Sequence, residues 1–210
     1  MSFIDEIYID LNWRISELAS LKTIPLRYHL LPDHKELLIK YSVPSIYALW
    51  EGFVKNAFWL YIREINMLAL QTNNVHINLL THSLSSIDKL SLENPRVTYK
   101  AKKKFIEYYQ NTICQPFKIT DKLPTKSNID FAVMSEILQR FNLEQLSSSF
   151  ETKLSKLLTF RNKIAHGDYS IPVKVEDIEF FTQLVIDLMT AILLNIENGH
   201  IRQTYLNNPT

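Results

Sequence analysis

The chain has 210 residues, of which 46% are apolar, and its formal net charge is +1. A chain of this length and apolar content buries a core, so disorder throughout the chain is excluded. Because the net charge is close to zero, the whole chain exerts no field that draws it to nucleic acid or membrane. Any such binding must therefore be local.

The cysteine content and the N-terminal sequence predict a cytoplasmic protein without a membrane partner. Cys114 is the only cysteine, so the chain cannot form an internal disulfide, as expected in a reducing compartment. The stretch MSFIDEIYID is acidic and does not resemble a secretory signal peptide. The most apolar late segment, LVIDLMTAILLNI, is too short to span a bilayer and contains Asp187.

The chain contains only three glycines, Gly52, Gly167 and Gly199. Phosphate-cradling loops of the P-loop or dinucleotide type need several glycines close together, so they are excluded. Long segments without glycine or proline favour helices.

The first predicted element is an amphipathic helix over residues 2–20, where apolar residues recur at three- and four-residue spacing. Ser2 and Asp5 predict a capping box at its start. Pro25 and Pro32 then predict a break in the chain.

A short helix is expected from Asp33 to Tyr41, and Pro44 is expected to open the most strongly predicted helix, which continues to residue 70. Proline fits the first turn of a helix, where its missing N–H costs nothing. The broad apolar face of this helix predicts a central place in a bundle. That face consists of Ile46, Leu49, Trp50, Phe53, Ala57, Leu60 and Tyr61.

Residues 71–94 are polar and mixed, and predict some helix with loops. Pro95 precedes a predicted helix over residues 98–113, and a proline-containing loop follows. We therefore expect residues 71–128 to form an insertion between core helices. With this insertion, residues 1–210 are expected to form a single helical domain.

The last third of the chain predicts three helices. The first runs from about Asp130 to Phe141, with Asn128 or Asp130 as its cap, and the last covers residues 175–199 and ends at Gly199. Between them lies a helix over residues 148–166, for which Gly167 is the expected C′ stop. The expected buried residues of this middle helix are Leu154, Leu157, Leu158, Ile164 and Ala165. All these elements together predict an all-α fold.

The segment RNKIAHGDYS combines residue types that suit phosphate chemistry. Arg161 can grip a phosphate with two parallel donors, and histidine is the side chain suited to proton transfer near neutral pH. Asn162 lies four residues before His166, on the same helix face, where it could orient the imidazole. Arg161 and His166, however, diverge by about 140° on an ideal helix. The alternative is an ordinary helix terminus, because basic side chains complement the dipole there.

The sequence resembles the HEPN superfamily, whose signature is an arginine, a polar residue, a short spacer and a histidine. Arg161-Asn162-x-x-x-His166 matches that signature near the end of a core helix. The earlier segment YALWEGFVKNAFWLYI, with Glu51 and Lys55, is similar to the aromatic-x-x-x-Glu-x-x-x-Lys helix of the prokaryotic MAE-type HEPN branch. SNIDFAVMSEILQRFNL resembles the connecting segment of that branch.

The resemblance implies an antiparallel four-helix bundle, here with extra helices and a mixed helical and loop insertion. It also implies a homodimer in which two motifs meet across a cleft. The implied activity is that of a metal-independent endoribonuclease, in which the RNA 2′-hydroxyl attacks its own phosphate and leaves a 2′,3′-cyclic phosphate. Arg161 would stabilise the transition state, His166 would act as general acid or base, and Asn162 would orient. Neither a metal nor a cofactor is implied.

The resemblance also implies a biological setting, that of a toxin or phage-defence effector with RNA as substrate and an antitoxin or another defence protein as partner. The alternative within the same fold is a non-catalytic binding module in such a complex, because a fold does not decide function.

Two further groups of residues remain open between a functional and a structural interpretation. Glu51 and Lys55 are either a surface helix pair or a supporting pair in which Glu51 contacts Arg161 or lines the cleft. A basic cluster near Tyr99 and Phe105 is either an RNA-binding surface or a solvated helix face. It consists of Lys100, Lys102, Lys103 and Lys104.

The remaining histidines show no spacing typical of metal ligands, so no metal site is predicted. They are His29, His34, His76, His82 and His200.

Overall fold

The computed structural model describes residues 1–85, 99–113, 115–120, 123–125, 128–168 and 170–208. Every regular element within these ranges is a helix, which confirms the predicted all-α fold. The α-helices are α1 (Phe3–Arg27), α2 (Pro32–Met67), α3 (Ile77–Ser85), α4 (Tyr99–Ile113), α5 (Phe131–Arg140), α6 (Ser149–Ala165) and α7 (Val175–Ile201), and a 3-10 helix, η1, covers Thr72–Asn74.

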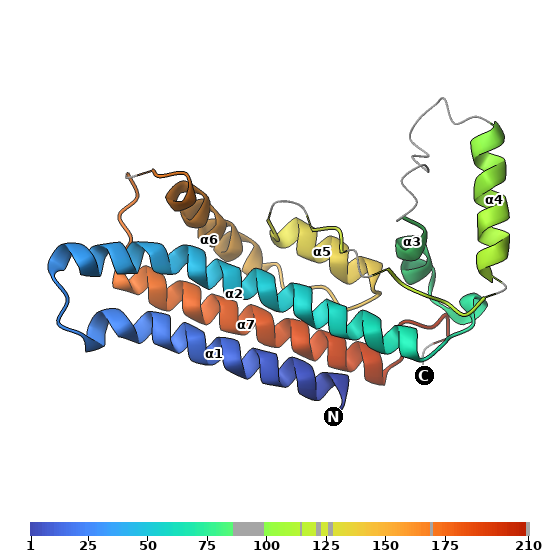
Figure 1. Ribbon diagram of the computed structural model, residues 1–210, viewed down its shortest axis with the longest axis horizontal. Helices are drawn as coiled ribbons and strands as arrows, with labels where there is room; N and C mark the ends of the chain where they lie inside the picture. The colour runs from blue at the N-terminus through green and yellow to red at the C-terminus, as the bar shows by residue number, and fades with distance from the viewer. Residues whose placement is uncertain (86–98, 114, 121–122, 126–127, 169, 209–210) are drawn as a thin grey trace.

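Four of these helices, α1, α2, α6 and α7, form the predicted bundle (Figure 1). Helices α2 and α7 lie side by side and run in the same direction, whereas α1 packs against both of them in the opposite direction. Helix α6 packs against the same two helices and also runs opposite to them. The four helices therefore alternate in direction along the chain.

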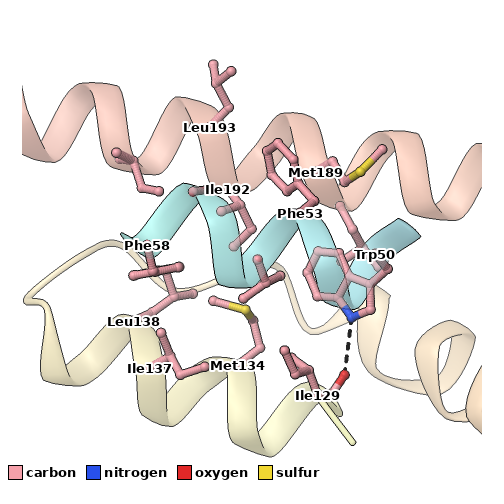
Figure 2. Packing of buried hydrophobic residues seen from close by; sticks show 14 of the residues in the cluster. Trp50, Phe53, Phe58, Ile129, Met134, Ile137, Leu138, Met189, Ile192 and Leu193 are labelled. Carbon is pink, nitrogen blue, oxygen red and sulfur yellow. Dashed lines mark hydrogen bonds between the residues drawn. The ribbon is translucent and has the colours of Figure 1, made fainter. Parts of the chain in front are cut away.

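Helix α2 supplies the centre of the core, because aromatic side chains cover its buried face (Figure 2). Trp50 and Phe53 are completely buried, and Trp50 Nε1 donates a hydrogen bond of 3.2 Å to the Ile129 carbonyl, just before α5. The buried residues that α5 and α7 add to this cluster include Met134, Ile137, Leu138, Met189 and Ile192. Burial of large side chains like these is the main force that holds the bundle together.

Helix α2 is longer than the sequence predicted, because Pro44 lies inside it and does not open it. The two helices expected at Asp33–Tyr41 and after Pro44 are one continuous helix. Proline inside a helix removes one hydrogen bond and costs about 3 kcal/mol. Here Val43 and Ile46 are completely buried on either side of the proline, so packing outweighs that cost.

Helix α1 begins as predicted and ends later than predicted. Asp5 N donates to Ser2 Oγ at 3.1 Å and Ser2 N donates to Asp5 Oδ2 at 2.8 Å, which confirms the capping box. Pro25 was expected to break the chain, but it is buried within the last turn of the helix, which ends at Arg27.

The chain leaves the bundle at the end of α2, and residues 117–119 return beside that same helix end. Asn66 makes two hydrogen bonds to the backbone of Ile119, with the side-chain Nδ2 donating at 3.0 Å and Oδ1 accepting at 2.8 Å. Phe117 N donates to the Leu70 carbonyl at 2.7 Å. Helix α4 stands away from the bundle (Figure 1). Pro95 and Cys114 lie outside the described residues.

Helix α5 begins as predicted, because the side chain of Asp130 accepts a hydrogen bond of 2.8 Å from Val133 N. In α6 the prediction that Ala165 is buried is wrong, because that residue faces solvent in the last turn. The other four residues of α6 that were expected to be buried are buried.

Gly199 does not end the last helix, as had been predicted, because α7 continues to Ile201. Its role is close packing: a Cβ at this position would clash with Leu143 Cδ2 and would lie 3.2 Å from Thr204 Oγ1. Leu143, from the segment between α5 and α6, is buried against this point.

We predict that Gly199→Val lowers the free energy of unfolding by about 1–3 kcal/mol, the usual cost of overpacking a core. Chemical denaturation measures this change. Because the clash is with Leu143, the penalty should be smaller when Gly199→Val is made in a Leu143→Ala background. An equal penalty in both backgrounds would contradict the packing explanation.

Candidate functional site

The segment that carries Arg161, Asn162 and His166 forms the C-terminal turn of α6 and the residue that follows it. Arg161 and Asn162 are half-buried where α6 meets α2, and His166 is exposed. The fold therefore places the Arg161 and Asn162 side chains against the bundle and leaves the His166 side chain in solvent.

Gly167 ends α6 as predicted, with a φ of +75°. Gly167 N donates to the Ile164 carbonyl at 3.1 Å, and Asp168 N donates to the Lys163 carbonyl at 2.9 Å. This pair of hydrogen bonds is the Schellman motif, which satisfies carbonyls that the helix end leaves free. The motif fixes the point at which the chain turns away from His166.

The Arg161 guanidinium is held by a ring and an amide. Its Cζ lies 5.0 Å from the centroid of the Tyr47 ring in α2, and Nη1 donates to Asn162 Oδ1 at 2.8 Å. Asn162 was expected to orient His166, but its side chain binds Arg161. Among the described residues the one hydrogen bond between Asn162 and His166 is the helical bond from His166 N to the Asn162 carbonyl at 3.0 Å.

Tyr47, on which Arg161 lies, is almost completely buried, and its hydroxyl makes two hydrogen bonds. The hydroxyl accepts from Ile129 N at 2.7 Å and donates to the Glu51 carboxylate. Burial, followed by the Glu51 charge and this donated hydrogen bond, raises the pKa of Tyr47 to about 12, although Ile129 and Arg161 act in the opposite direction. Tyr47 is therefore neutral at physiological pH.

Glu51 and Lys55 form the ion pair predicted from their spacing, with Lys55 Nζ 2.5 Å from Glu51 Oε1. The Glu51 side chain is 22% exposed and the Lys55 side chain is 51% exposed, so the pair spans the edge of the core. The partners of Glu51 are Lys55 and Tyr47. Among the described residues no ion pair joins Glu51 to Arg161, which was one of the alternatives left open, and Tyr47 contacts both side chains instead.

A single chain does not bring Arg161 and His166 together. Helix α6 keeps its hydrogen bonding up to His166, so it does not loosen in the way that would let the two side chains converge. Arg161 faces Tyr47, and within the described part of the chain no hydrogen bond or ion pair involves the His166 imidazole.

The loop after His166 is tied to the first half of α2. Lys40 Nζ donates to the Asp168 carbonyl at 3.3 Å. The hydrogen bonds from Ser170, followed by the charges of Lys163 and Lys40, lower the pKa of the Asp168 carboxyl. An anionic Asp168 and two lysines thus surround the turn that presents His166.

The four lysines of the basic cluster are all exposed on α4. Lys103 lies 3.7 Å from Glu107, and the Phe105 ring stacks on Tyr109 with centroids 6.2 Å apart. Helix α4 and α6 lie at opposite ends of the molecule (Figure 1). The structure therefore does not bring Lys100, Lys102 or Lys104 beside Arg161.

His82, on α3, lies apart from this site. It is buried, and burial followed by the charge of Arg140 lowers its pKa to about 4. Among the described residues no group of three histidine, cysteine, aspartate or glutamate side chains gathers in a way that would hold a metal ion. None of the helices in the described ranges has the length and hydropathy needed to cross a membrane.

Tyr47 is the site residue that the sequence analysis did not single out. It lies four residues before Glu51, at the aromatic position of the aromatic-x-x-x-Glu-x-x-x-Lys pattern. The pattern therefore contained a signal for Tyr47, but the contacts with Arg161 and Ile129 appear only in the folded chain.

Comparison with protein families relates nearly the whole chain to one of them. The model of the HEPN_MAE_28990-like HEPN family matches residues 3–205, a range that includes the four bundle helices and the candidate site. This match confirms the resemblance predicted from the sequence. No curated protein and no solved structure gave a significant match.

We predict that Gly167→Ala lowers the free energy of unfolding by about 1 kcal/mol, because a Cβ disfavours the left-handed backbone even where space is free. Gly167→Asn should cost less, because asparagine tolerates this conformation better than alanine. Thermal and chemical denaturation of the two variants measure the order. A cost for alanine equal to or below that for asparagine would contradict the assigned role of Gly167.

Proposed function

Because the chain belongs to the HEPN_MAE_28990-like HEPN family, we propose that it is a metal-independent endoribonuclease whose catalytic residues are Arg161 and His166. The observation that carries the proposal is how these two side chains are held and exposed. Arg161 is fixed against α2, and among the described residues one of its five N–H donors is used, on Asn162. His166 is exposed at the adjacent helix end.

The proposed reaction needs only proton transfers and charge stabilisation, because the substrate supplies its own nucleophile. The ribose 2′-oxygen attacks the neighbouring phosphorus, the bond from phosphorus to the 5′-oxygen breaks, and a 2′,3′-cyclic phosphate and a 5′-hydroxyl remain. His166 accepts the 2′-hydroxyl proton or donates a proton to the leaving 5′-oxygen. Arg161 stabilises the charge that builds up on the phosphate oxygens. Use of the 2′-hydroxyl spares DNA.

A second copy of the chain completes the site in this proposal. One chain holds Arg161 against Tyr47 and leaves His166 in solvent without a described hydrogen-bonding or ionic partner. A homodimer in which two α6 ends meet would allow one copy to supply Arg161 and the other His166. This arrangement is the one that the family resemblance implies.

The exposed lysines of α4 are proposed to bind RNA outside the cleavage site. Their charges can contact the RNA backbone, and the nearby Tyr99 ring, which is 83% exposed, can stack on a base. The proposed setting is that of a toxin or phage-defence effector, with an antitoxin or other defence protein as a further partner.

A non-catalytic binding module is the second candidate function. The observation that favours it is that Arg161 binds Tyr47 and Asn162 and not His166 within one chain. An arginine held in this way can bind a phosphate or a partner's carboxylate without any reaction.

We predict that the wild-type protein cleaves RNA in EDTA and leaves 2′,3′-cyclic phosphates, and that His166→Ala lowers the rate about 10²- to 10⁴-fold, the usual contribution of a general acid or base. The measurement uses total RNA and a tRNA pool, followed by end-group analysis. Arg161→Lys should also be slower, because lysine lacks the two-pronged donor set.

The matched control is His76→Asn, at the start of α3. His76 Nδ1 accepts from Asn78 N at 3.2 Å, and asparagine keeps an acceptor there while removing the imidazole. This variant should cleave RNA at the wild-type rate. Absence of cleavage by folded, dimeric wild type would reject the enzyme and favour the binding module.

A further inference from the structure

The contacts of Arg161 indicate a role for a residue outside the Arg161–His166 motif. We infer that Tyr47 is a positioning residue, which holds the Arg161 guanidinium in place while its donors stay available to a phosphate. This inference rests on the proposed function for its catalytic consequence, but the geometry that it concerns belongs to the folded chain.

A neutral ring holds the Arg161 side chain in place. A half-buried arginine is usually held by a carboxylate, which takes two of its donors and neutralises its charge. Here no ion pair to Arg161 occurs in the described part of the chain, and its Cζ lies over the Tyr47 ring at 5.0 Å. A ring face attracts the cation through its quadrupole and occupies no donor. The guanidinium is therefore held in place without a competing anion.

The Tyr47 ring is itself fixed. Tyr47 is 1% exposed, and its hydroxyl is bound by Ile129 N at 2.7 Å and by the Glu51 carboxylate. Trp50, one turn further along α2, donates to the carbonyl of the same Ile129 at 3.2 Å. Both backbone polar groups of Ile129 thus bind α2 side chains. The ring has little freedom to tilt or slide beneath the guanidinium.

Glu51 forms no ion pair with Arg161 among the described residues, because other groups hold its carboxylate. The Glu51 carboxylate is held on one side by Lys55 Nζ at 2.5 Å and on the other by the Tyr47 hydroxyl. Both interactions satisfy its charge away from Arg161. Glu51 therefore contributes here as an anchor for the Tyr47 ring.

A fixed position of the guanidinium contributes to catalysis in the proposed reaction. A long arginine side chain loses much rotational freedom when it binds a phosphate, and a group held in place beforehand avoids that cost at the moment of reaction. Displacement of a catalytic group by about 1 Å can cost about 10²-fold in rate. Loss of the Tyr47 ring should therefore reduce kcat more than it raises KM.

The test combines nuclear magnetic resonance with kinetics on the full-length protein. The Arg161 Nε–Hε resonance is assigned by its disappearance in Arg161→Lys. In the wild type we expect a ring-shifted resonance with the heteronuclear NOE of an ordered group. Tyr47→Leu keeps an apolar side chain at this position but removes the ring. In this variant we expect the Arg161 resonance to lose its ring shift and the Arg161 side chain to become mobile. An unchanged resonance in a folded Tyr47→Leu protein would overturn the inference.

The kinetic arm is a double-mutant cycle. Tyr47→Leu should lower kcat about 10- to 100-fold in the wild-type background and should produce no further fall in an Arg161→Ala background. A merely structural role would lower kcat in both backgrounds, and that result would overturn the inference. Tyr8→Leu, which removes a partly exposed tyrosine of α1, is the control and should leave kcat unchanged.

The experiment also distinguishes a Tyr47→Leu protein that does not fold from a wild type that does not cleave RNA. If Tyr47→Leu does not fold, Tyr47→Phe takes its place: the ring remains, but the bonds to Ile129 and Glu51 are lost, so we expect a more mobile Arg161 and a smaller fall in kcat. If the wild type cleaves no RNA, the proposed function is rejected. The resonance of Arg161 then still decides whether Tyr47 positions the guanidinium.

Discussion

The contact between the Arg161 guanidinium and the Tyr47 ring joins the two helices that carry the candidate site. Helix α6 supplies the arginine and α2 supplies the ring, and the ring is fixed in turn by Ile129, just before α5, and by Glu51. Three segments that are far apart in the sequence therefore determine where one cation lies. The aromatic core of α2 is the framework on which this arrangement depends, because Trp50 and Tyr47 both bind Ile129.

The same contact links stability to the proposed chemistry. A half-buried charge is costly unless neighbouring groups stabilise it. Here the neutral Tyr47 ring and the Asn162 amide stabilise the Arg161 guanidinium and leave its positive charge in place. The consequence is a cation that keeps most of its donors for a ligand. His166 lies just before Gly167 in the Schellman turn, so one chain presents a fixed arginine and an exposed imidazole at the same end of α6. That division suits a site completed by a second chain.

Local signals made the ends of several elements predictable. The capping residues Ser2 and Asp130 and the stop at Gly167 act within a few residues of themselves, and the structure places each as predicted. Pro44 and Gly199 were misinterpreted because their effects depend on distant packing. The buried face of α2 overrides the helix-breaking tendency of Pro44, and Leu143 packs where Gly199 lacks a side chain.

The site was predictable only to the extent that its residues lie close together in the sequence. Arg161, Asn162 and His166 were singled out because they lie in one short segment that matches a family signature, and the spacing of Glu51 and Lys55 predicted their ion pair. The partners of Arg161 and Asn162 were not predictable in the same way. Arg161 contacts a ring 114 positions earlier in the chain, a contact that exists only because α6 packs on α2.

The central claim, that Arg161 of one chain and His166 of another act together on RNA, is tested most directly by mixing two inactive variants. Arg161→Ala and His166→Ala proteins are combined, unfolded and refolded together, and assayed for RNA cleavage in EDTA. The account predicts that the mixture regains activity, because a mixed dimer contains one site with an intact Arg161 and an intact His166 from different chains. A mixture that forms mixed dimers, as shown by differently tagged chains, yet stays as inactive as either variant alone would contradict it.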